Sequence, residues 1–218
     1  MPDLALENAC EGSVIGIDEA GRGPWAGPVT VTALWLNPHH YNQIPGDVDD
    51  SKKIKPERCA ALATYLAAPP HLHCTISSDV KIIDQLGILK ATLVAMAAAV
   101  TSLIADLRKA GFAGPCHALV DGNIVPPDMP CPSTAVVRGD ARSLSIAGAS
   151  LIAKHSRDAL MHELDSQWPA YGWATNKGYG TRQHQQALAA HGVSPQHRRS
   201  FAPIRRLLET VPPHHDKY

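Results

Sequence analysis

The sequence predicts a mixed α/β fold in which a central mixed β-sheet is flanked by helices and followed by a helical C-terminal appendage. Three observations support this prediction. Short runs of apolar and β-branched residues recur along the first 140 positions, and a stretch from Val80 to Lys109 places apolar residues three or four apart. Beyond Trp168 the chain becomes polar and basic, with short helical patterns. With 218 residues, 44% of them hydrophobic and 18% charged, the chain can bury a substantial core.

Five short segments are predicted to be strands because they are rich in apolar and β-branched residues. Glycines between the first two segments form the turn that joins them, and the third segment follows a Pro-Pro break. The last two segments are each closed by an aspartate and a glycine. In chain order the five are SVIGID (13–18), PVTVTALWL (28–36), HLHCTISS (71–78), HALVDG (117–122) and STAVVRGD (133–140).

Helices are expected at 56–68, 80–109, 143–164, 181–190 and 203–208. The first begins at Pro56, a residue favoured in the first helical turn. The helix at 143–164 contains a run of small residues that would let it lie close against a sheet. The helix at 80–109 is expected to bury one apolar stripe, formed by Leu86, Leu89, Leu93, Met96, Val100, Ile104 and Leu107.

Composition excludes several classes of protein. We expect no membrane-spanning segment, because no apolar run approaches the roughly 18 residues needed. The N-terminus MPDLALENAC lacks the pattern of a secretory signal, and we expect a cytoplasmic location. Five scattered cysteines without a C-x-x-C pair predict neither a disulfide framework nor a zinc site. A formal net charge of zero argues against a general nucleic-acid coat protein, but allows a basic track beside an acidic site.

Acidic residues occur in one recurring context. Asp18, Asp121 and Asp140 each end a strand-like run, and Glu19 follows the first of them. If the strands are neighbours, these carboxylates converge at one edge of the sheet, where their mutual repulsion favours a bound cation. Mg²⁺ or Mn²⁺ suits an all-carboxylate site better than zinc. The alternative is that each aspartate merely caps a turn, and consecutive strand residues point to opposite faces, so Asp18 and Glu19 share a site only if the strand ends or twists there.

A Gly-Arg-Gly sequence follows the first acidic pair. Gly21 and Gly23 permit close approach of the backbone to a ligand, and Arg22 between them can face a phosphate. A glycine-rich nucleotide-binding loop is the alternative. However, the chain has no G-x-x-x-x-G-K-[ST] motif and no G-x-G-x-x-G after a strand.

With these residues placed, the chain resembles bacterial ribonuclease HII, the type 2 ribonuclease H. The motifs that carry the likeness occur in the family's order across about residues 13 to 204, and they are GIDEAGRGPWAGPV, DDSKKI, LVDGN, AVVRGDARSLSIAGASLIAKHSRD, YGWATNKGYGT and HRRSFAP. The resemblance implies a ribonuclease H-like fold with four catalytic and metal-binding acids, which by motif are Asp18, Glu19, Asp121 and Asp140.

The resemblance also implies an activity. It implies Mg²⁺- or Mn²⁺-dependent endonucleolytic cleavage of RNA in RNA–DNA hybrids, with two divalent ions in the catalytic complex. It further implies nicking on the 5′ side of single ribonucleotides in duplex DNA, which leaves a 3′-hydroxyl and a 5′-phosphate. No obligate protein partner and no membrane partner is expected.

The family senses the 2′-hydroxyl at an RNA-to-DNA junction with its Gly-Arg-Gly and the tyrosine of its KGY motif. In this chain those residues are Gly21, Arg22, Gly23 and Tyr179. The 2′-hydroxyl is the group that distinguishes a ribonucleotide from a deoxyribonucleotide, and backbone groups freed by glycine can hydrogen-bond it. Without the resemblance, Tyr179 would be taken as a loop aromatic residue that covers the edge of the core.

Several basic residues can contact phosphates along a nucleic-acid backbone, and each could equally be a solvated charge. The resemblance favours phosphate contact for Lys52, Lys53 and Lys154, although Lys154 could simply pair with Asp158 one helical turn away. The other candidates of this kind are Arg157, Arg198 and Arg199.

The expected organisation is an N-terminal tail at 1–12, a ribonuclease H-like catalytic domain at 13–168, a helical appendage packed on the same domain at 169–209, and a disordered tail at 210–218. Two departures from the family pattern are Trp25, where aliphatic residues are commoner, and Gly148, which interrupts a run of alanines. Gly148 should cost its helix up to about 1 kcal/mol relative to alanine.

Two other functions fit parts of the sequence. A non-catalytic nucleic-acid binder would use the acids as a structural cation site. Another ribonuclease H-like enzyme, such as a resolvase or transposase, would act on pure DNA and has no evident need for the Gly-Arg-Gly sequence with Tyr179.

Overall fold

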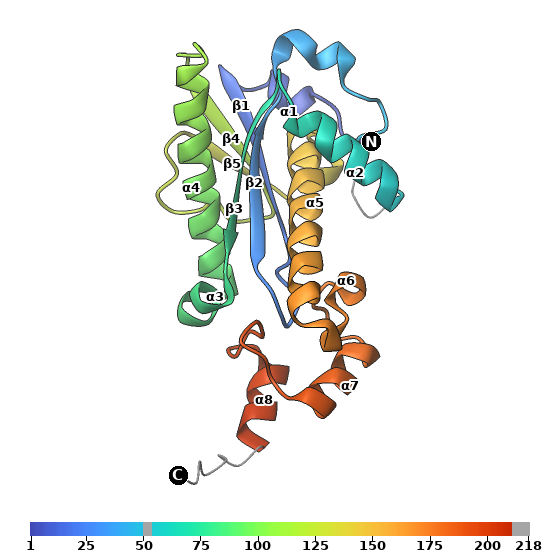
Figure 1. Ribbon diagram of the computed structural model, residues 1–218. Helices are drawn as coiled ribbons and strands as arrows, with labels where there is room; N and C mark the ends of the chain where they lie inside the picture. The colour runs from blue at the N-terminus through green and yellow to red at the C-terminus, as the bar shows by residue number, and fades with distance from the viewer. Residues whose placement is uncertain (50–53, 211–218) are drawn as a thin grey trace.

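The computed structural model describes residues 1–49 and 54–210, and it confirms the predicted mixed α/β fold (Figure 1). Lys52, Lys53 and residues 211–218 of the expected C-terminal tail lie outside the described residues. One five-stranded sheet has the order β3-β2-β1-β4-β5. β1 pairs antiparallel with β2 and parallel with β4, so the sheet is mixed. The strands are β1 (Ser13–Ala20), β2 (Val29–Trp35), β3 (Leu72–Ser78), β4 (Cys116–Asp121) and β5 (Ser133–Val136).

Helices cover both faces of the sheet (Figure 1). α4 (Ile88–Lys109) packs on one face, and α5 (Leu144–Gln167) packs on the other together with α2 (Pro56–Ala67). Every residue of β2 is buried, because the strand lies in the interior of the sheet with both faces covered. A strand buried on both sides is mostly apolar, and the hydroxyls of the two buried threonines of β2, Thr30 and Thr32, are paired with Ser77 and Thr75 of β3.

α5 lies unusually close to β1, and a glycine makes this possible. A Cβ atom on Gly16 would lie 2.2 Å from the carbonyl carbon of Ser145 at the start of α5. On α5 itself, a Cβ atom on Gly148 would lie 2.5 Å from Leu34 Cδ2. The departure at Gly148 therefore has a packing reason, since the side chains of the neighbouring core occupy the space that an alanine would need.

The single helix expected at 80–109 is in fact two helices, α3 (Val80–Leu86) and α4. Gly87 between them has a φ of 77°, a conformation that glycine adopts readily and that ends a helix. The break also corrects the predicted apolar stripe, because Leu86 and Leu89 are 39% and 43% exposed. The stripe's buried members are Met96, Val100, Ile104 and Leu107, with Leu93 partly buried against the same core.

Short elements occur where the sequence predicted none. α1 (Ala5–Asn8) lies in the expected N-terminal tail, where the buried Glu7 accepts hydrogen bonds from both the hydroxyl and the amide of Ser145. The expected loop after β2 contains a 3-10 helix at Pro38–Gln43. Two further 3-10 turns lie at Gly139–Ala141 and Pro169–Tyr171.

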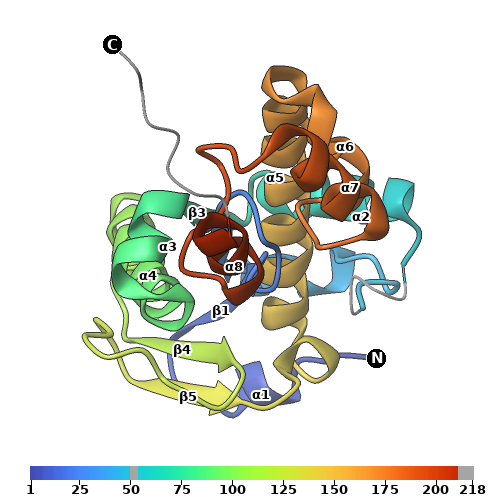
Figure 2. The ribbon, with the colours of Figure 1, turned by 90° about the horizontal axis from the view of Figure 1, so that it is seen from below.

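The C-terminal appendage is helical, as predicted, and lies at one end of the sheet against the second half of α5 (Figure 2). Its helices are α6 (Trp173–Asn176), α7 (Arg182–His191) and α8 (Ala202–Thr210). Met161 of α5 packs with Tyr171 and Trp173 in a core cluster of their own. The appendage is therefore joined to the sheet domain by continuous apolar packing.

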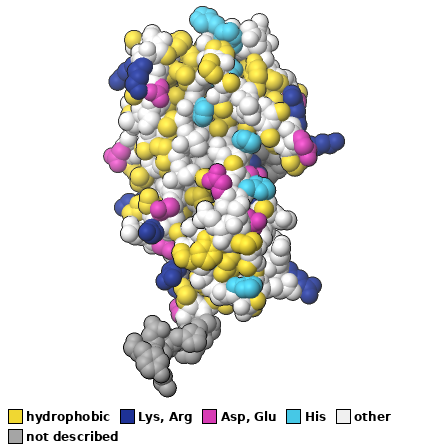
Figure 3. Space-filling model, in the orientation of Figure 1, with side chains coloured by type: hydrophobic (Ala, Val, Ile, Leu, Met, Phe, Trp, Pro, Cys, Tyr) yellow, Lys and Arg dark blue, Asp and Glu magenta, His cyan; other side chains and the backbone are white. Residues whose placement is uncertain are grey.

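The expectation that the chain has no membrane-spanning segment stays a prediction. The α4 segment is long and apolar enough, by length and composition, to cross a bilayer. A core helix meets the same criteria, however, and one face of α4 packs on the sheet through residues such as Val100 and Leu103. On the face shown in Figure 3, Lys and Arg side chains are scattered rather than gathered into one patch, as expected for a chain of zero net charge.

Candidate active site

A pocket of about 390 Å³ lies where the parallel strands β1 and β4 end. It brings together the four predicted acids, the Gly-Arg-Gly sequence, Tyr179 and Lys154, but not the candidate phosphate contacts Arg157, Arg198 and Arg199. The pocket is lined by Asp18, Glu19, Ala20, Gly21, Arg22, Gly23, Asp121, Asp140, Ser150, Lys154 and Tyr179. These residues come from β1, the loop after it, β4, the turn before α5, α5 itself and the loop after α6.

The four acids reach the pocket in different ways. Asp18 and Glu19 are consecutive residues of β1, which continues to Ala20, and both line the pocket near the end of the strand. Asp121 ends β4 and accepts a 2.6 Å hydrogen bond from the backbone amide of Gly139. Asp140 does not end a strand as predicted, because β5 stops at Val136 and a 3-10 turn presents Asp140 instead.

The electrostatics of the pocket show crowded negative charge. Burial raises the pKa of the Asp18 carboxyl well above its usual range, and the charges of Glu19 and Asp121 raise it further. Hydrogen bonds from the Ser150 hydroxyl and the Glu19 amide act in the opposite direction. The pKa of Glu19 is raised mainly by burial, while Arg22, 3.3 Å away, lowers it. A cation would relieve this strain, because it favours the ionised form of every nearby carboxyl.

The donor set fits a hard divalent cation, since it consists of carboxylates with a hydroxyl beside them. In the described part of the chain, however, no group of three or more His, Cys, Asp or Glu side chains is arranged to hold a metal ion as it stands. The four acids share a pocket but not a finished coordination shell. Their side chains would have to move to bring their oxygens onto a common ion.

Two arginines that the sequence suggested as phosphate contacts are buried structural residues instead. Arg198 has no exposed surface, and its guanidinium donates to the carbonyls of Gly21 (2.7 Å) and Arg22 (2.9 Å). Arg157 is 2% exposed and donates to the carbonyls of Pro28, Ala26 and Lys177. Arg198 therefore holds the Gly-Arg-Gly loop by its carbonyls, whereas Arg157 packs against Gly21, where a Cβ atom would lie 1.8 Å from its Nε, and bonds the segments on either side. Burial lowers the pKa of Arg198 to about 9, and the nearby charge of Arg157 adds to this effect.

Arg199, the third arginine of that group, points elsewhere: its backbone amide donates to Asp84 Oδ2 at 3.0 Å, and its side chain is at the surface. The sequence could not separate these cases. A burial site built mostly from carbonyls that are distant along the chain leaves no trace in the local pattern around an arginine.

Tyr179 is half-exposed at the rim of the pocket, beside the Gly-Arg-Gly loop. A Cβ atom on Gly23 would lie 3.4 Å from Tyr179 Cε1, so the tyrosine ring and this glycine are in contact range. The backbone carbonyl of Tyr179 is 3.0 Å from Nδ1 of His184, a fully buried residue of α7. His184 Nε2 is in turn 3.0 Å from Nε2 of His197. The histidine pair was not predicted, and its sequence positions give no metal-ligand spacing that would have drawn attention to it.

Lys154 lies on α5 at the edge of the pocket and pairs with Asp158, as the spacing on the helix allowed. Ser150, one turn earlier, was seen in the sequence only as a small residue that lets the helix approach the sheet. Its hydroxyl bonds Asp18, so it also belongs to the pocket.

Comparisons with known proteins identify the family and the fold. The profile of the family described as Ribonuclease HII matches residues 15–204. A ribonuclease HII of Jannaschia sp. is 47% identical over 207 residues, which cover 95% of this chain and 98% of the relative. A ribonuclease HII of Rhodospirillum rubrum is 46% identical over 210 residues, which cover 95% of this chain and 92% of the relative.

Solved structures share the fold at lower sequence identity. The ribonuclease H2 of Pyrococcus horikoshii matches with a TM-score of 0.71 at 22% identity, over 90% of this chain and 97% of that one. Bst-RNase HIII, solved in complex with Mn²⁺, matches with a TM-score of 0.76 at 20% identity, over 94% of this chain and 72% of that one. By the extent of the profile match and the identity to its curated relatives, the chain belongs to the ribonuclease HII family.

Proposed function

We propose that this chain, a type 2 ribonuclease H whose family acts on RNA in RNA–DNA hybrids, also nicks duplex DNA on the 5′ side of a single embedded ribonucleotide. The products are a 3′-hydroxyl and a 5′-phosphate. One observation carries the proposal: the four acids share a single pocket with the Gly-Arg-Gly loop and Tyr179. An acidic pocket alone suits many metal-dependent nucleases, whereas a backbone loop and an aromatic ring beside it suit recognition of a sugar.

Asp18, Glu19, Asp121 and Asp140 are the residues that would hold the divalent ions, Mg²⁺ or Mn²⁺. Two such ions supply an activated water and neutralise the leaving 3′-oxygen of an in-line displacement. The fit rests on the donor set, because these four carboxylates line one pocket with the Ser150 hydroxyl, and the pKa of Asp18 is raised there by burial and by the charges of Glu19 and Asp121. The chain needs no nucleophile of its own in this scheme, so no covalent intermediate forms.

The chain's own residues orient the substrate. Arg198 draws the carbonyls of Gly21 and Arg22 inward, which fixes the course of the loop at the pocket rim. We infer that loop atoms left facing the pocket hydrogen-bond the 2′-hydroxyl of the ribonucleotide, and that the Tyr179 ring packs on the next sugar. A deoxyribose fits there, and an added hydroxyl would be detected. Lys154, and by resemblance Lys52 and Lys53, would contact backbone phosphates.

A nicking assay tests the proposal. The substrates are a labelled duplex with one ribonucleotide, a long RNA–DNA hybrid and an all-DNA duplex of the same sequence. We expect nicking of the first two with Mg²⁺ or Mn²⁺, none with chelator, and none of the all-DNA duplex. Cleavage of the all-DNA control would favour a resolvase-like enzyme, and binding without metal-dependent cleavage would favour a non-catalytic binder.

The acids are tested by isosteric substitution. Asp18→Asn and Asp121→Asn each remove a charge and keep the shape of the side chain, so the fold should survive while cleavage falls below detection. Wild-type turnover by either variant, with a melting temperature close to that of the wild type, would refute the assignment of that acid.

A further inference from the structure

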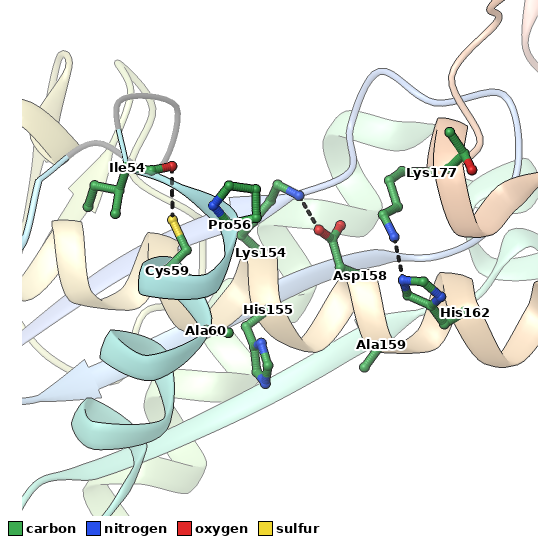
Figure 4. A pocket seen from close by; sticks show the side chains of 11 residues that line it. Ile54, Pro56, Cys59, Ala60, Lys154, His155, Asp158, Ala159, His162 and Lys177 are labelled. Atoms are coloured by element: carbon green, nitrogen blue, oxygen red, sulfur yellow. Dashed lines mark hydrogen bonds and ion pairs between the residues drawn. The ribbon is translucent and has the colours of Figure 1, made fainter.

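A second cavity adjoins the catalytic pocket. It has a volume of about 610 Å³ and lies among α2, α5 and the segment around α6 (Figure 4). Lys154 lines both hollows, so the two are neighbours along α5. The cavity is lined by Ile54, Pro56, Cys59, Ala60, Lys154, His155, Asp158, Ala159, His162, Thr175 and Lys177.

The charge of this cavity is opposite to that of the catalytic pocket. Two ammonium groups, those of Lys154 and Lys177, face a single carboxylate, Asp158. Arg157, which donates to the Lys177 carbonyl at 3.1 Å, adds a buried positive charge behind the cavity wall. Burial lowers the pKa of Lys177, and the charges of Lys154 and Arg157 lower it further, partly offset by Asp158 and Asp165. Crowded cations of this kind are relieved by an anion, as crowded carboxylates are by a metal.

Lys177 is also held so that its ammonium reaches the cavity. It occupies the left-handed region, with a φ of 52°, at the end of α6 and two residues before Tyr179. Its Nζ donates to the carbonyl of Ala174 at 2.6 Å and lies 2.9 Å from His162 Nε2. An ammonium has three donors, so these two contacts leave one N–H for a further acceptor. Figure 4 shows the Lys154 ammonium directed at Asp158 and the Lys177 ammonium directed at His162, with Asp158 between the two lysines.

We propose that this cavity binds a backbone phosphate of the same nucleic-acid strand that is cleaved in the catalytic pocket, with Lys177 and Lys154 as its donors. The inference rests on the proposed function, because it takes the neighbouring pocket to hold the scissile bond. A nucleic-acid strand is the occupant that the geometry favours over a free anion, because Lys154 lines both hollows and a strand held in the catalytic pocket would lie beside this cavity. The site reads no base and serves to fix the register of the strand.

The test compares Lys177→Met with the wild type and with Lys109→Met, which removes the same charge from the exposed end of α4. The kinetic constants for nicking a duplex with one ribonucleotide are measured over a series of NaCl concentrations. Loss of one phosphate contact reduces the slope of log(kcat/KM) against log[salt] by about 0.7–0.9. We expect that reduction for Lys177→Met, with KM raised about fivefold to tenfold at low salt and kcat within twofold, and no change for Lys109→Met.

Two further variants separate the loss of the Lys177 charge from local misfolding caused by the substitution. His162→Glu places a carboxylate on an exposed side chain beside Lys177 and should raise KM at least as strongly, whereas Lys177→Arg keeps the charge and should restore the wild-type salt slope. Duplexes are also shortened stepwise on each side of the ribonucleotide. On one side, once the duplex is too short to reach the cavity, Lys177→Met and the wild type should have the same KM.

Equal salt slopes for the wild type, Lys177→Met and Lys109→Met would overturn the inference while leaving the proposed function intact. A wild-type enzyme that nicks no ribonucleotide-containing duplex would instead refute the proposed function itself. Inorganic phosphate serves as a probe for a free anion: if it inhibits the wild type but not Lys177→Met and the salt slopes are equal, the cavity is a small-anion site and the strand assignment is wrong.

Discussion

Replacing Gly16 with alanine tests how closely the site depends on the contact between β1 and α5. A Cβ atom at this position would lie 2.2 Å from the Ser145 carbonyl carbon, 2.4 Å from the Ile146 nitrogen and 2.5 Å from the Ser145 oxygen. Ordinary contact between carbon atoms needs about 3.5 Å, so the start of α5 would have to retreat by about 1 Å. Both obstacles are backbone, and neither side can adapt by changing a rotamer.

Forced overpacking costs about 1–3 kcal/mol, and a backbone obstacle places Gly16→Ala near the upper end of that range. For a chain of this length each kcal/mol corresponds to about 2–4 °C in melting temperature, so we expect a fall of about 6–12 °C. α5 also carries Ser150 and Lys154 into the catalytic pocket, so cleavage should decline with stability. Thermal melting and urea titration measure the first effect, and the nicking assay measures the second.

Gly148→Ala is the matched control, because it adds the same methyl group to the same interface region from the helix. Its Cβ atom would meet Leu34 Cδ2 at 2.5 Å and Leu66 Cδ1 at 3.2 Å, which are the ends of side chains. Alanine also favours the helix by up to about 1 kcal/mol, so the net loss should be smaller than for Gly16→Ala. A Gly16→Ala variant that melts no lower than the wild type, or a larger loss for Gly148→Ala, would refute this reasoning.

Four other changes test separate parts of the site. Tyr179→Ala should reduce cleavage at a lone ribonucleotide more than cleavage of a long hybrid, and equal loss on both in the nicking assay would argue against junction sensing. Arg198→Ala should lower the unfolding free energy by about 3–5 kcal/mol in urea titrations, because several buried carbonyls lose a charged donor. A loss below about 1 kcal/mol would show that the Gly-Arg-Gly loop does not need the Arg198 guanidinium. Without divalent ions, the unfolding free energy of the wild type should fall as pH rises through the elevated pKa of Asp18, since the folded state holds that proton longer than the unfolded state does. Asp18→Asn should lack this fall, and saturating Mn²⁺ at 100 times Kd should stabilise the wild type by about 2.7 kcal/mol but not the variant. Burial and the neighbouring His184 lower the pKa of His197 to about 4, so below pH 6.5 the unfolded state takes up a proton that the folded state does not. The unfolding free energy should therefore drop by roughly 3 kcal/mol as the pH falls from 6.5 to 4, at about 1.4 kcal/mol per pH unit. An unfolding free energy that stays constant over that range would contradict the lowered pKa of His197.

Much of the fold could be predicted from the sequence because the elements are long and apolar on the side that is buried. The strands are rich in apolar and β-branched residues, and the small residues of α5 are clustered near its start, where the helix packs against the sheet. The break between α3 and α4 was missed for a physical reason. Apolar spacing continues on both sides of Gly87, and a single glycine inside a helical pattern is compatible with either a continuous helix or a helix end.

The candidate site divides in the same way. The acids and the Gly-Arg-Gly sequence stand at the ends of apolar runs, so their gathering in one pocket could be predicted from position along the chain. The roles of Arg198 and His184 could not be predicted. Arg198 bonds the carbonyl of Gly21, which is distant along the chain, and His184 bonds the carbonyl of Tyr179, which only the folded loop brings to it. A charged or polar side chain looks the same in a sequence whether it is solvated or buried.

This division has a functional consequence. Asp18 and Asp121 are placed by the strands of the sheet, whereas the Gly-Arg-Gly loop and Tyr179 are held by residues of the appendage, through Arg198 and His184. The chemistry and the recognition of the ribonucleotide therefore depend on different parts of the structure. Consider a substitution that loosens the appendage without unfolding the sheet. It should leave the stabilisation by divalent metal ions unchanged, but it should reduce the difference in binding affinity between ribonucleotide-containing and all-DNA duplexes. Coupled loss of both properties in every such variant would mean that the two parts act as one unit.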